Sequence, residues 1–121
     1  MPVNKVILVG RLGGEPDVRY PAQGQIVVSF RLATKEHAYT AANGMQYPER
    51  TEWHNIVLWG RNAENAARFL HKGSLIYLEG KLRTRTYDDR NNIKHYITEV
   101  YVDTFELLGR PSEETSQQQN P

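Results

Sequence analysis

The sequence contains no cysteine, so disulfide bonds, thiolate nucleophiles and cysteine-bound zinc are excluded. It also has no apolar run near the roughly 18 residues that a membrane-spanning helix requires. The N-terminus has only a short apolar run up to Val9 and lacks the basic start, long apolar stretch and cleavage site of a secretory signal. We therefore expect no membrane partner, and the absence of cysteine fits the reducing cytoplasm.

Strong charge is also missing, because the formal net charge is +1 over 121 residues. All 15 Lys and Arg residues and 12 of the 14 acids precede residue 111, which gives that part +3. The last eleven residues contain only Glu113 and Glu114, or −2. Any affinity for nucleic acid must therefore come from where the charges lie. We predict one domain over residues 1–110 and a short, polar, disordered tail over residues 111–121.

Five segments have the apolar, β-branched character of strands, with turn residues between them. The loop over residues 35–50 contains Asn43-Gly44, a pair typical of tight hairpin turns. Residues 88–92 form a second polar turn. The predicted strands are residues 6–12, 26–34, 52–59, 74–87 and 95–102, with residues 103–108 as a candidate extension.

One segment has helical instead of alternating periodicity, over residues 62–73. Asn62 is suited to cap its first amides and Gly73 to follow its end. Its apolar face is predicted to contain Ala63, Ala66, Ala67 and Leu70. Three strands, a helix and two strands are the layout of an all-β OB-fold, a five-stranded Greek-key barrel with one short helix between strands 3 and 4.

Both tryptophans lie in the third predicted strand, six residues apart, at Trp53 and Trp59. Side chains alternate between the faces of a strand, so the two indoles share one face while Ile56 and Leu58 point to the other. A strand that buries Ile and Leu and turns two large rings outward suggests a binding surface. Flat rings near basic residues are typical of proteins that stack the bases of single-stranded nucleic acid.

Ordered motifs along the chain resemble those of bacterial single-stranded DNA-binding proteins, and the similarity covers about residues 3–109. It implies an OB-fold, a cytoplasmic homotetramer, and sequence-tolerant binding of single-stranded DNA during replication, recombination and repair. It implies no catalysis and no cofactor. The motifs are Asn4–Gly10, Leu12-Gly13, Glu15–Tyr20, Leu32–Thr34, Thr51–His54, Lys72–Ser74, Glu79–Arg85 and Tyr96–Val100.

Four rings are implied to stack on bases. Trp53 matches a stacking tryptophan of the family, and Trp59 falls where the family usually has phenylalanine. Tyr87 falls where tryptophan is frequent. Tyr39 is the counterpart of a further tryptophan in the long loop, although an extra loop residue leaves Ala38 as the alternative match. The competing interpretation is that a ring belongs to the core or to a subunit interface.

Three cations and one ring alternate along the fourth predicted strand, which places Lys81, Arg83, Arg85 and Tyr87 on one side. Phosphates require the cations and a base requires the ring. Asn55 stands where the family often has arginine, so one contact is weakened or lost. For any single cation the alternative is a solvated surface charge. Further candidate phosphate contacts are Arg61, Lys72, Lys5, Arg11, Lys35 and Arg50.

Other candidate residues are considered for subunit association, metal binding or catalysis. The resemblance ties His54 to subunit association, and Tyr77 lies at a tetramer contact or in the core. We expect no metal, because nothing in the spacing requires His54 to converge with Glu52, His95 or Glu99. Two other hypotheses stay open: a primosomal or RNA-preferring OB-fold module, and a small nuclease that acts through Glu52, His54, Asp88 or Asp89.

The family's chains usually end in a long linker and an acidic tip that recruits replication and repair proteins. Here Glu113 and Glu114 are too few and too early to replace such a tip. We therefore expect a specialised copy that coats DNA and recruits partners poorly, and a truncated chain would look the same.

Overall fold

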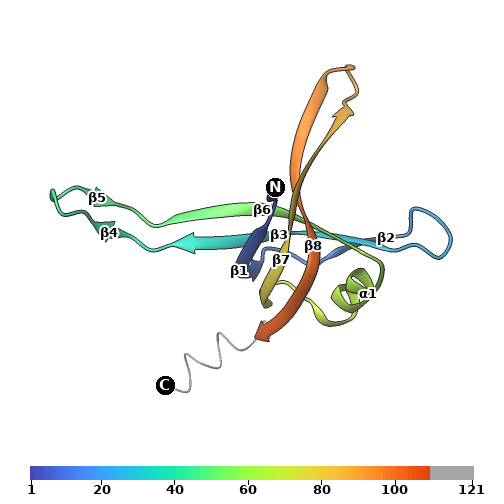
Figure 1. Cartoon of the computed structure of the whole chain (residues 1–121), viewed down its shortest axis with the longest axis horizontal. Coiled ribbons are helices and arrows are strands. Elements are labelled where there is room, and N and C mark those ends of the chain that lie inside the picture. Colours follow the sequence, from blue (N-terminus) through green and yellow to red (C-terminus); the bar gives the residue numbers. More distant parts are fainter. Residues whose placement is uncertain (110–121) are drawn as a thin grey trace.

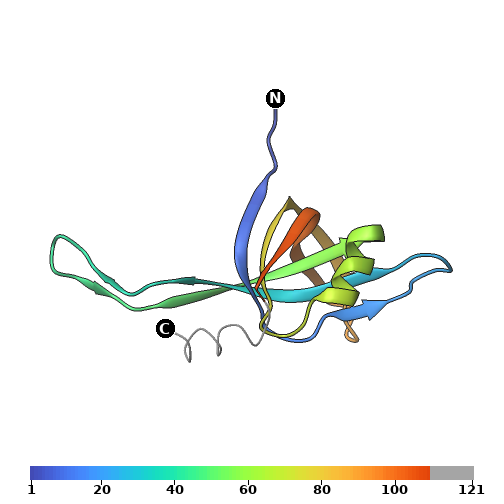
Figure 2. The same ribbon diagram turned by 90° about the horizontal axis from the view of Figure 1, so that it is seen from below.

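Five long strands close into a barrel in the computed structural model, which describes residues 1–109 (Figures 1 and 2). The sheet order is β1-β7-β8-β6-β3, and pairing of β1 with β3 closes it. The helix α1 (Gly60–Phe69) lies between β6 and β7. The predicted five-stranded OB-fold with one short helix between its third and fourth long strands is confirmed. The long strands are β1 (Val6–Leu12), β3 (Val27–Glu36), β6 (Arg50–Trp59), β7 (Leu75–Asp88) and β8 (Lys94–Gly109).

The core of the barrel consists of one face of each strand. Ile56 and Leu58 of β6 are buried, whereas residues 50–53 and Trp59 at the two ends of that strand are exposed. The helix adds Ala63 and Ala66 to the same core, and Leu70 at its C-terminal cap is also buried. Burial of such aliphatic side chains stabilises a fold by about 1.5–3 kcal/mol each for the larger ones. On the outward face of β6, Trp53 and Trp59 remain exposed.

Two β-ribbons project from the barrel as arms (Figure 1). The β4–β5 arm, residues 37–49, joins β3 to β6 and contains β4 (Tyr39–Thr40) and β5 (Gln46–Tyr47). The amide of Gly44, which has φ +88°, donates to the carbonyl of Ala41, so the predicted Asn43-Gly44 turn is confirmed. The β7–β8 arm, residues 83–98, is the outer part of the hairpin between those two strands.

Some predicted boundaries are wrong. The short strand β2 (Asp17–Arg19) pairs with β3 through Val18 and Val28 and was not predicted. The strands β3 and β6 each extend two residues further toward the β4–β5 arm than predicted. The predicted tail, residues 111–121, lies outside the described residues.

The helix begins and ends earlier than predicted. It starts at Gly60, directly after β6, and its N-cap residue Trp59 makes no side-chain cap bond. Asn62 is inside the helix and donates to the carbonyl oxygen of Asp103 at 3.0 Å, so its predicted capping role is wrong. The helix ends at Phe69, so Gly73 belongs to a later turn, and Ala67 is exposed. Within residues 1–109, no helix combines the length and apolar character needed to cross a membrane.

Candidate nucleic-acid interface

Two adjoining clefts lie on the outer face of β3 and β6, and together we call them the aromatic groove. The first has a volume of about 630 Å³ and contains Trp53. The second has a volume of about 380 Å³ and contains Trp59. Both are open to solvent, and the two rings therefore lie along one continuous surface. The clefts share Asp17, Ser29, Arg85 and Glu99.

The register of β6 against β3 explains why the two indoles share this groove. Trp53 lies opposite Ala33 and Trp59 opposite Val27, six pairs apart on one face. The indoles are 44% and 47% exposed, whereas Ile56 is fully buried. The predicted alternation is confirmed, and neither indole belongs to the barrel core. Their role in stacking stays a prediction.

Trp53 is held in place by two neighbours from other strands. The guanidinium carbon of Arg31 in β3 lies 4.9 Å from the centroid of the ring. Gly13, just after β1, packs against the six-membered end of the indole. A Cβ atom on Gly13 would lie 2.8 Å from Cη2 and closer still to Cζ3. The position of this ring therefore depends on the absence of a side chain at residue 13.

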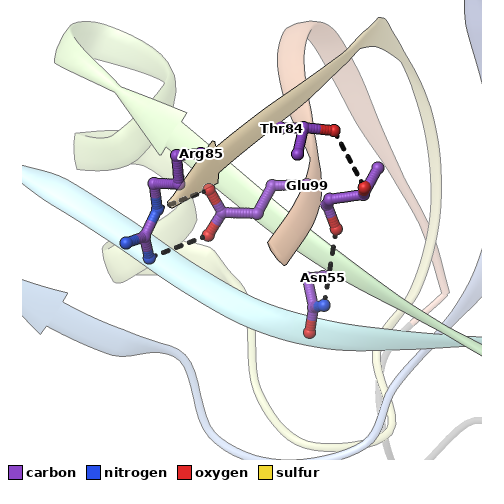
Figure 3. Close-up of polar contacts among 5 residues, drawn as sticks. Asn55, Thr84, Arg85 and Glu99 are labelled. Atoms are coloured by element: carbon purple, nitrogen blue, oxygen red, sulfur yellow. Dashed lines mark hydrogen bonds and ion pairs between the residues drawn. The ribbon is translucent and has the colours of Figure 1, made fainter. Parts of the chain in front are cut away.

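An ion pair between β7 and β8 lies at the centre of the groove (Figure 3). The Nε of Arg85 donates to one carboxylate oxygen of Glu99 at 2.9 Å, and Nη2 donates to the other at 3.3 Å. Glu99 is only 6% exposed, while the Arg85 side chain is 55% exposed. The hydrogen bond and charge of Glu99 raise the pKa of Arg85. A phosphate in this groove would therefore share Arg85 with a resident carboxylate.

The predicted cationic side of β7 is formed as expected from its alternation. Lys81, Arg83 and Arg85 lie opposite Tyr101, Glu99 and Ile97 of β8. The guanidinium carbon of Arg83 lies 5.4 Å from the centroid of the Tyr101 ring, and Tyr101 lines the second cleft. The cationic side thus continues from the groove onto the β7–β8 arm.

Tyr87 lies further out on this arm and stacks on His95 of the opposite strand. Their centroids are 5.1 Å apart with an interplanar angle of 18°. His95 also contacts Asp89 with an Nε2–Oδ2 distance of 2.8 Å. The Asp89 carboxylate also accepts hydrogen bonds from the backbone amides of Asn91 and Ile93. The hydrogen bond with His95, followed by these two, lowers the pKa of Asp89. Asp89 therefore holds the turn of the arm.

The groups of the nuclease hypothesis lie in separate places. Asp88 and Asp89 lie at the end of the β7–β8 arm, whereas Glu52 and His54 lie in β6 opposite β3. His54 contacts the hydroxyl of Thr34 with an Nε2–Oγ1 distance of 2.9 Å. Within the described part of the chain, no three His, Asp or Glu side chains gather in a way that could hold a metal ion.

Other predicted cations have carboxylate or carbonyl partners outside the groove. The Nζ of Lys5 lies 2.7 Å from Oε1 of Glu79, and Glu79 also accepts the hydroxyl of Tyr77. These two bonds lower the pKa of Glu79, and the bond to Glu79 raises that of Tyr77. Arg11 donates to the carbonyl of Gly73 at 2.9 Å. Lys5 and Tyr77 therefore form one cluster on the outer side of β1 and β7.

The remaining predicted cations lie near the two ends of β6 or after α1. Arg61, in the first turn of α1, lines a cleft of about 390 Å³ together with Trp59. Lys35 and Arg50 lie at the opposite end, where β3 and β6 enter the β4–β5 arm. Lys72 follows α1, and its backbone amide donates to Glu15 at 2.9 Å, which is the main cause of the lowered pKa of Glu15.

Sequence reasoning missed several groove residues. Arg31 shares its strand face with Ser29, and this alternation was visible in the sequence, but its place opposite Asn55 required the register of β3 and β6. Asn55 itself lines the first cleft, and its amide reaches the backbone carbonyl of Thr98 at 3.5 Å (Figure 3). Arg31 therefore places a guanidinium beside Asn55, the position at which the resemblance would lead one to expect an arginine. Other missed residues are Gly13, Asp17, Arg19 and Tyr101.

Comparisons with known proteins agree with this geometry. The model of the single-strand binding protein family matches residues 3–108. A single-stranded DNA-binding protein of Bacteroides thetaiotaomicron is 54% identical over 108 residues, which cover 89% of this chain and 67% of that protein. A solved structure described as the Plasmodium falciparum SSB complex with ssDNA has a TM-score of 0.79 and 31% identity, and covers 90% of this chain and 97% of that one. The similarity thus extends over the barrel and both arms.

Proposed function

The chain belongs to the single-strand binding protein family, and on this premise we propose that it binds and protects single-stranded DNA without cleaving it. The observation that carries the proposal is the aromatic groove, where Trp53 and Trp59 are exposed along one surface beside arginine residues. Flat rings bind any base because every base has a π-face, so the binding is tolerant of sequence. Replication, recombination and repair are the processes that supply such unpaired strands.

The two kinds of side chain have separate tasks in this proposal. Bases stack on Trp53, Trp59, Tyr87 and Tyr39, and each such contact contributes about 1–3 kcal/mol. Phosphates bind the cationic side of β7 and Arg31, which lies over Trp53. The remaining predicted cations stay candidates for the path of the strand beyond the groove.

A titration of the intrinsic tryptophan fluorescence tests the function. Poly(dT) is expected to quench the fluorescence at much lower concentrations than duplex DNA, because paired bases cannot reach the rings. Tighter binding of poly(U) than of poly(dT) would favour the RNA-preferring alternative. Cleavage of a labelled single strand in the presence of Mg²⁺ would contradict binding without catalysis.

Replacement of Arg83 by alanine is expected to reduce the salt dependence of binding. Each phosphate neutralised on a single strand contributes about −0.7 to the slope of log affinity against log salt. Arg83→Ala should flatten that slope by up to about 0.7 on poly(dT). Arg68→Ala is the matched control, because Arg68 is also exposed beside a ring, that of Phe69, but lies on α1. An Arg83→Ala slope equal to that of Arg68→Ala would remove Arg83 from the phosphate contacts.

We further propose that four copies of the chain associate. Ile7 and Val9 of β1 are 57% and 50% exposed. The strand pairs with β7 along residues 6–11, but its other edge pairs with β3 only at Arg11 and Leu12 within the described residues. An open apolar edge of this kind favours association. His54 and Tyr77 stay the predicted contacts.

Light scattering measures the number of copies. A particle mass of four times the 13.9 kDa chain is expected. A mass of one or two chains at the concentrations used for DNA titration would contradict the tetramer.

A further inference from the structure

The β4–β5 arm differs from the rest of the interface because residues 37–49 contain no lysine or arginine. The β7–β8 arm, residues 83–98, contains four basic and two acidic residues. Glu49 is the one residue of the β4–β5 arm with a full charge at neutral pH. Lys35 and Arg50 lie at the base of the arm, in β3 and β6, so attraction to phosphates cannot explain an interaction of residues 37–49 themselves with DNA.

The arm instead presents a preformed pair of stacked rings. Tyr39 and Tyr47 lie directly opposite each other in the β4–β5 ribbon. Their centroids are 4.8 Å apart with an interplanar angle of 16°. Each ring uses one face for this stack, and Tyr39 remains 57% exposed while Tyr47 is 39% exposed. A flat ring backed by a second ring is a rigid surface on which a base can lie.

The surroundings of the pair are uncharged as well. A cleft of about 400 Å³ lies around the two rings. Among residues 1–109, no charged side chain lines this cleft, so a ligand there can contact only ring faces, small side chains and amide groups. Its lining residues are Ala38, Tyr39, Thr40, Gln46, Tyr47 and Pro48.

The arm continues the strands that form the aromatic groove. Tyr47 and Trp53 are six positions apart in the chain, which spans up to about 20 Å when extended. In both views of the molecule the arm projects away from the barrel (Figures 1 and 2). A single strand that leaves the groove at Trp53 can therefore reach the rings only if it is long enough.

We propose that Tyr47 is a positioning residue, whose ring backs that of Tyr39 and so strengthens the stacking of Tyr39 on an unpaired base of a long single strand. The inference rests on the proposed function and deepens it. It assigns Tyr47 a positioning role and predicts that this contact contributes to affinity independently of salt.

The test compares Tyr39→Ala and Tyr47→Ala with Tyr47→Phe, which keeps the second ring. On a long oligo(dT), Tyr39→Ala is expected to lower affinity about fivefold or more. Tyr47→Ala should lower it about two- to tenfold, and Tyr47→Phe should not change it. The lines of log affinity against log salt should shift in parallel for both alanine variants, because no phosphate contact is lost.

Three results would overturn the inference. Unchanged affinity in both alanine variants would mean that the rings only stabilise the hairpin. A flattened salt slope would mean that the arm contacts phosphate. An equal loss on an oligo(dT) too short to leave the groove would mean that the variants disturb the groove itself. Failure of the wild-type chain to bind oligo(dT) would instead contradict the proposed function, so the two failures are distinguishable.

Discussion

Replacement of Trp53 by alanine is expected to weaken binding of poly(dT) by about 1–3 kcal/mol, or roughly 5- to 150-fold. The ring is 44% exposed in the groove, so its removal deletes a stacking surface and leaves the barrel core intact. The thermal unfolding midpoint should therefore change little. Titration with poly(dT) measures the loss, and Trp53→Phe, which keeps a ring, should retain most of the affinity. Equal affinity of wild type and Trp53→Ala would remove Trp53 from the site.

The contact of Gly13 with the Trp53 indole allows an independent test of the role of Trp53 in binding. A methyl group at residue 13 would overlap the indole, so Gly13→Ala should displace Trp53 and weaken binding in the same direction. Gly14→Ala is the matched control, because nothing lies within 4 Å of a Cβ atom there. A shift of the tryptophan emission in Gly13→Ala but not in Gly14→Ala would locate the change at the ring.

Replacement of Gly10 by alanine is expected to destabilise the fold strongly. Gly10 is buried where β1, still paired with β7, begins to meet β3. A Cβ atom there would lie 3.1 Å from both the carbonyl carbon of Ala33 and Cγ of Leu32, and would overlap the oxygen of Ala33. Since backbone cannot move aside without opening the barrel, the cost should reach the upper range for overpacking, about 3 kcal/mol.

Thermal unfolding at fixed protein concentration measures this effect, because association also changes the midpoint. The midpoint of Gly10→Ala should fall by about 10 °C relative to wild type. Gly14→Ala, whose added Cβ atom meets nothing within 4 Å, should stay within about 0.5 kcal/mol of wild type. An unchanged midpoint in Gly10→Ala would show that β1 and β3 can separate at this point without loss of stability.

The parts of the fold that repeat a local pattern were predictable from the sequence. Alternation in residues 52–59 placed Trp53 and Trp59 on one face, and the same period placed the cations of β7 together. These features depend only on the geometry of single strands. The prediction of where the helix begins was wrong because a tertiary contact outweighed the local capping preference of Asn62. Asn62 uses its amide for the Asp103 carbonyl, and β6 runs directly into Gly60.

Features that depend on register between strands were not predictable. A two-residue turn at Asn43-Gly44 would place Tyr39 opposite Pro48. The observed bond from the Ala41 amide to the Met45 carbonyl makes the loop one residue longer, and Tyr39 then faces Tyr47. The pair of Arg85 and Glu99 likewise depends on how β7 meets β8. β2 has three residues and no period that could reveal it.

The carboxylate of Glu99 gives the groove a property beyond affinity. Arg85 is already paired with the Glu99 carboxylate. A phosphate that binds Arg85 would therefore have to displace that carboxylate or share the guanidinium with it. The net gain at that position is smaller than the gain at an unpaired arginine, and the departing strand leaves a neutralised surface behind. Under the proposed function, free mononucleotides and other small anions should therefore be held more weakly at Arg85 than at an unpaired arginine. A long strand held through many contacts could exchange this one contact reversibly and leave the groove stepwise.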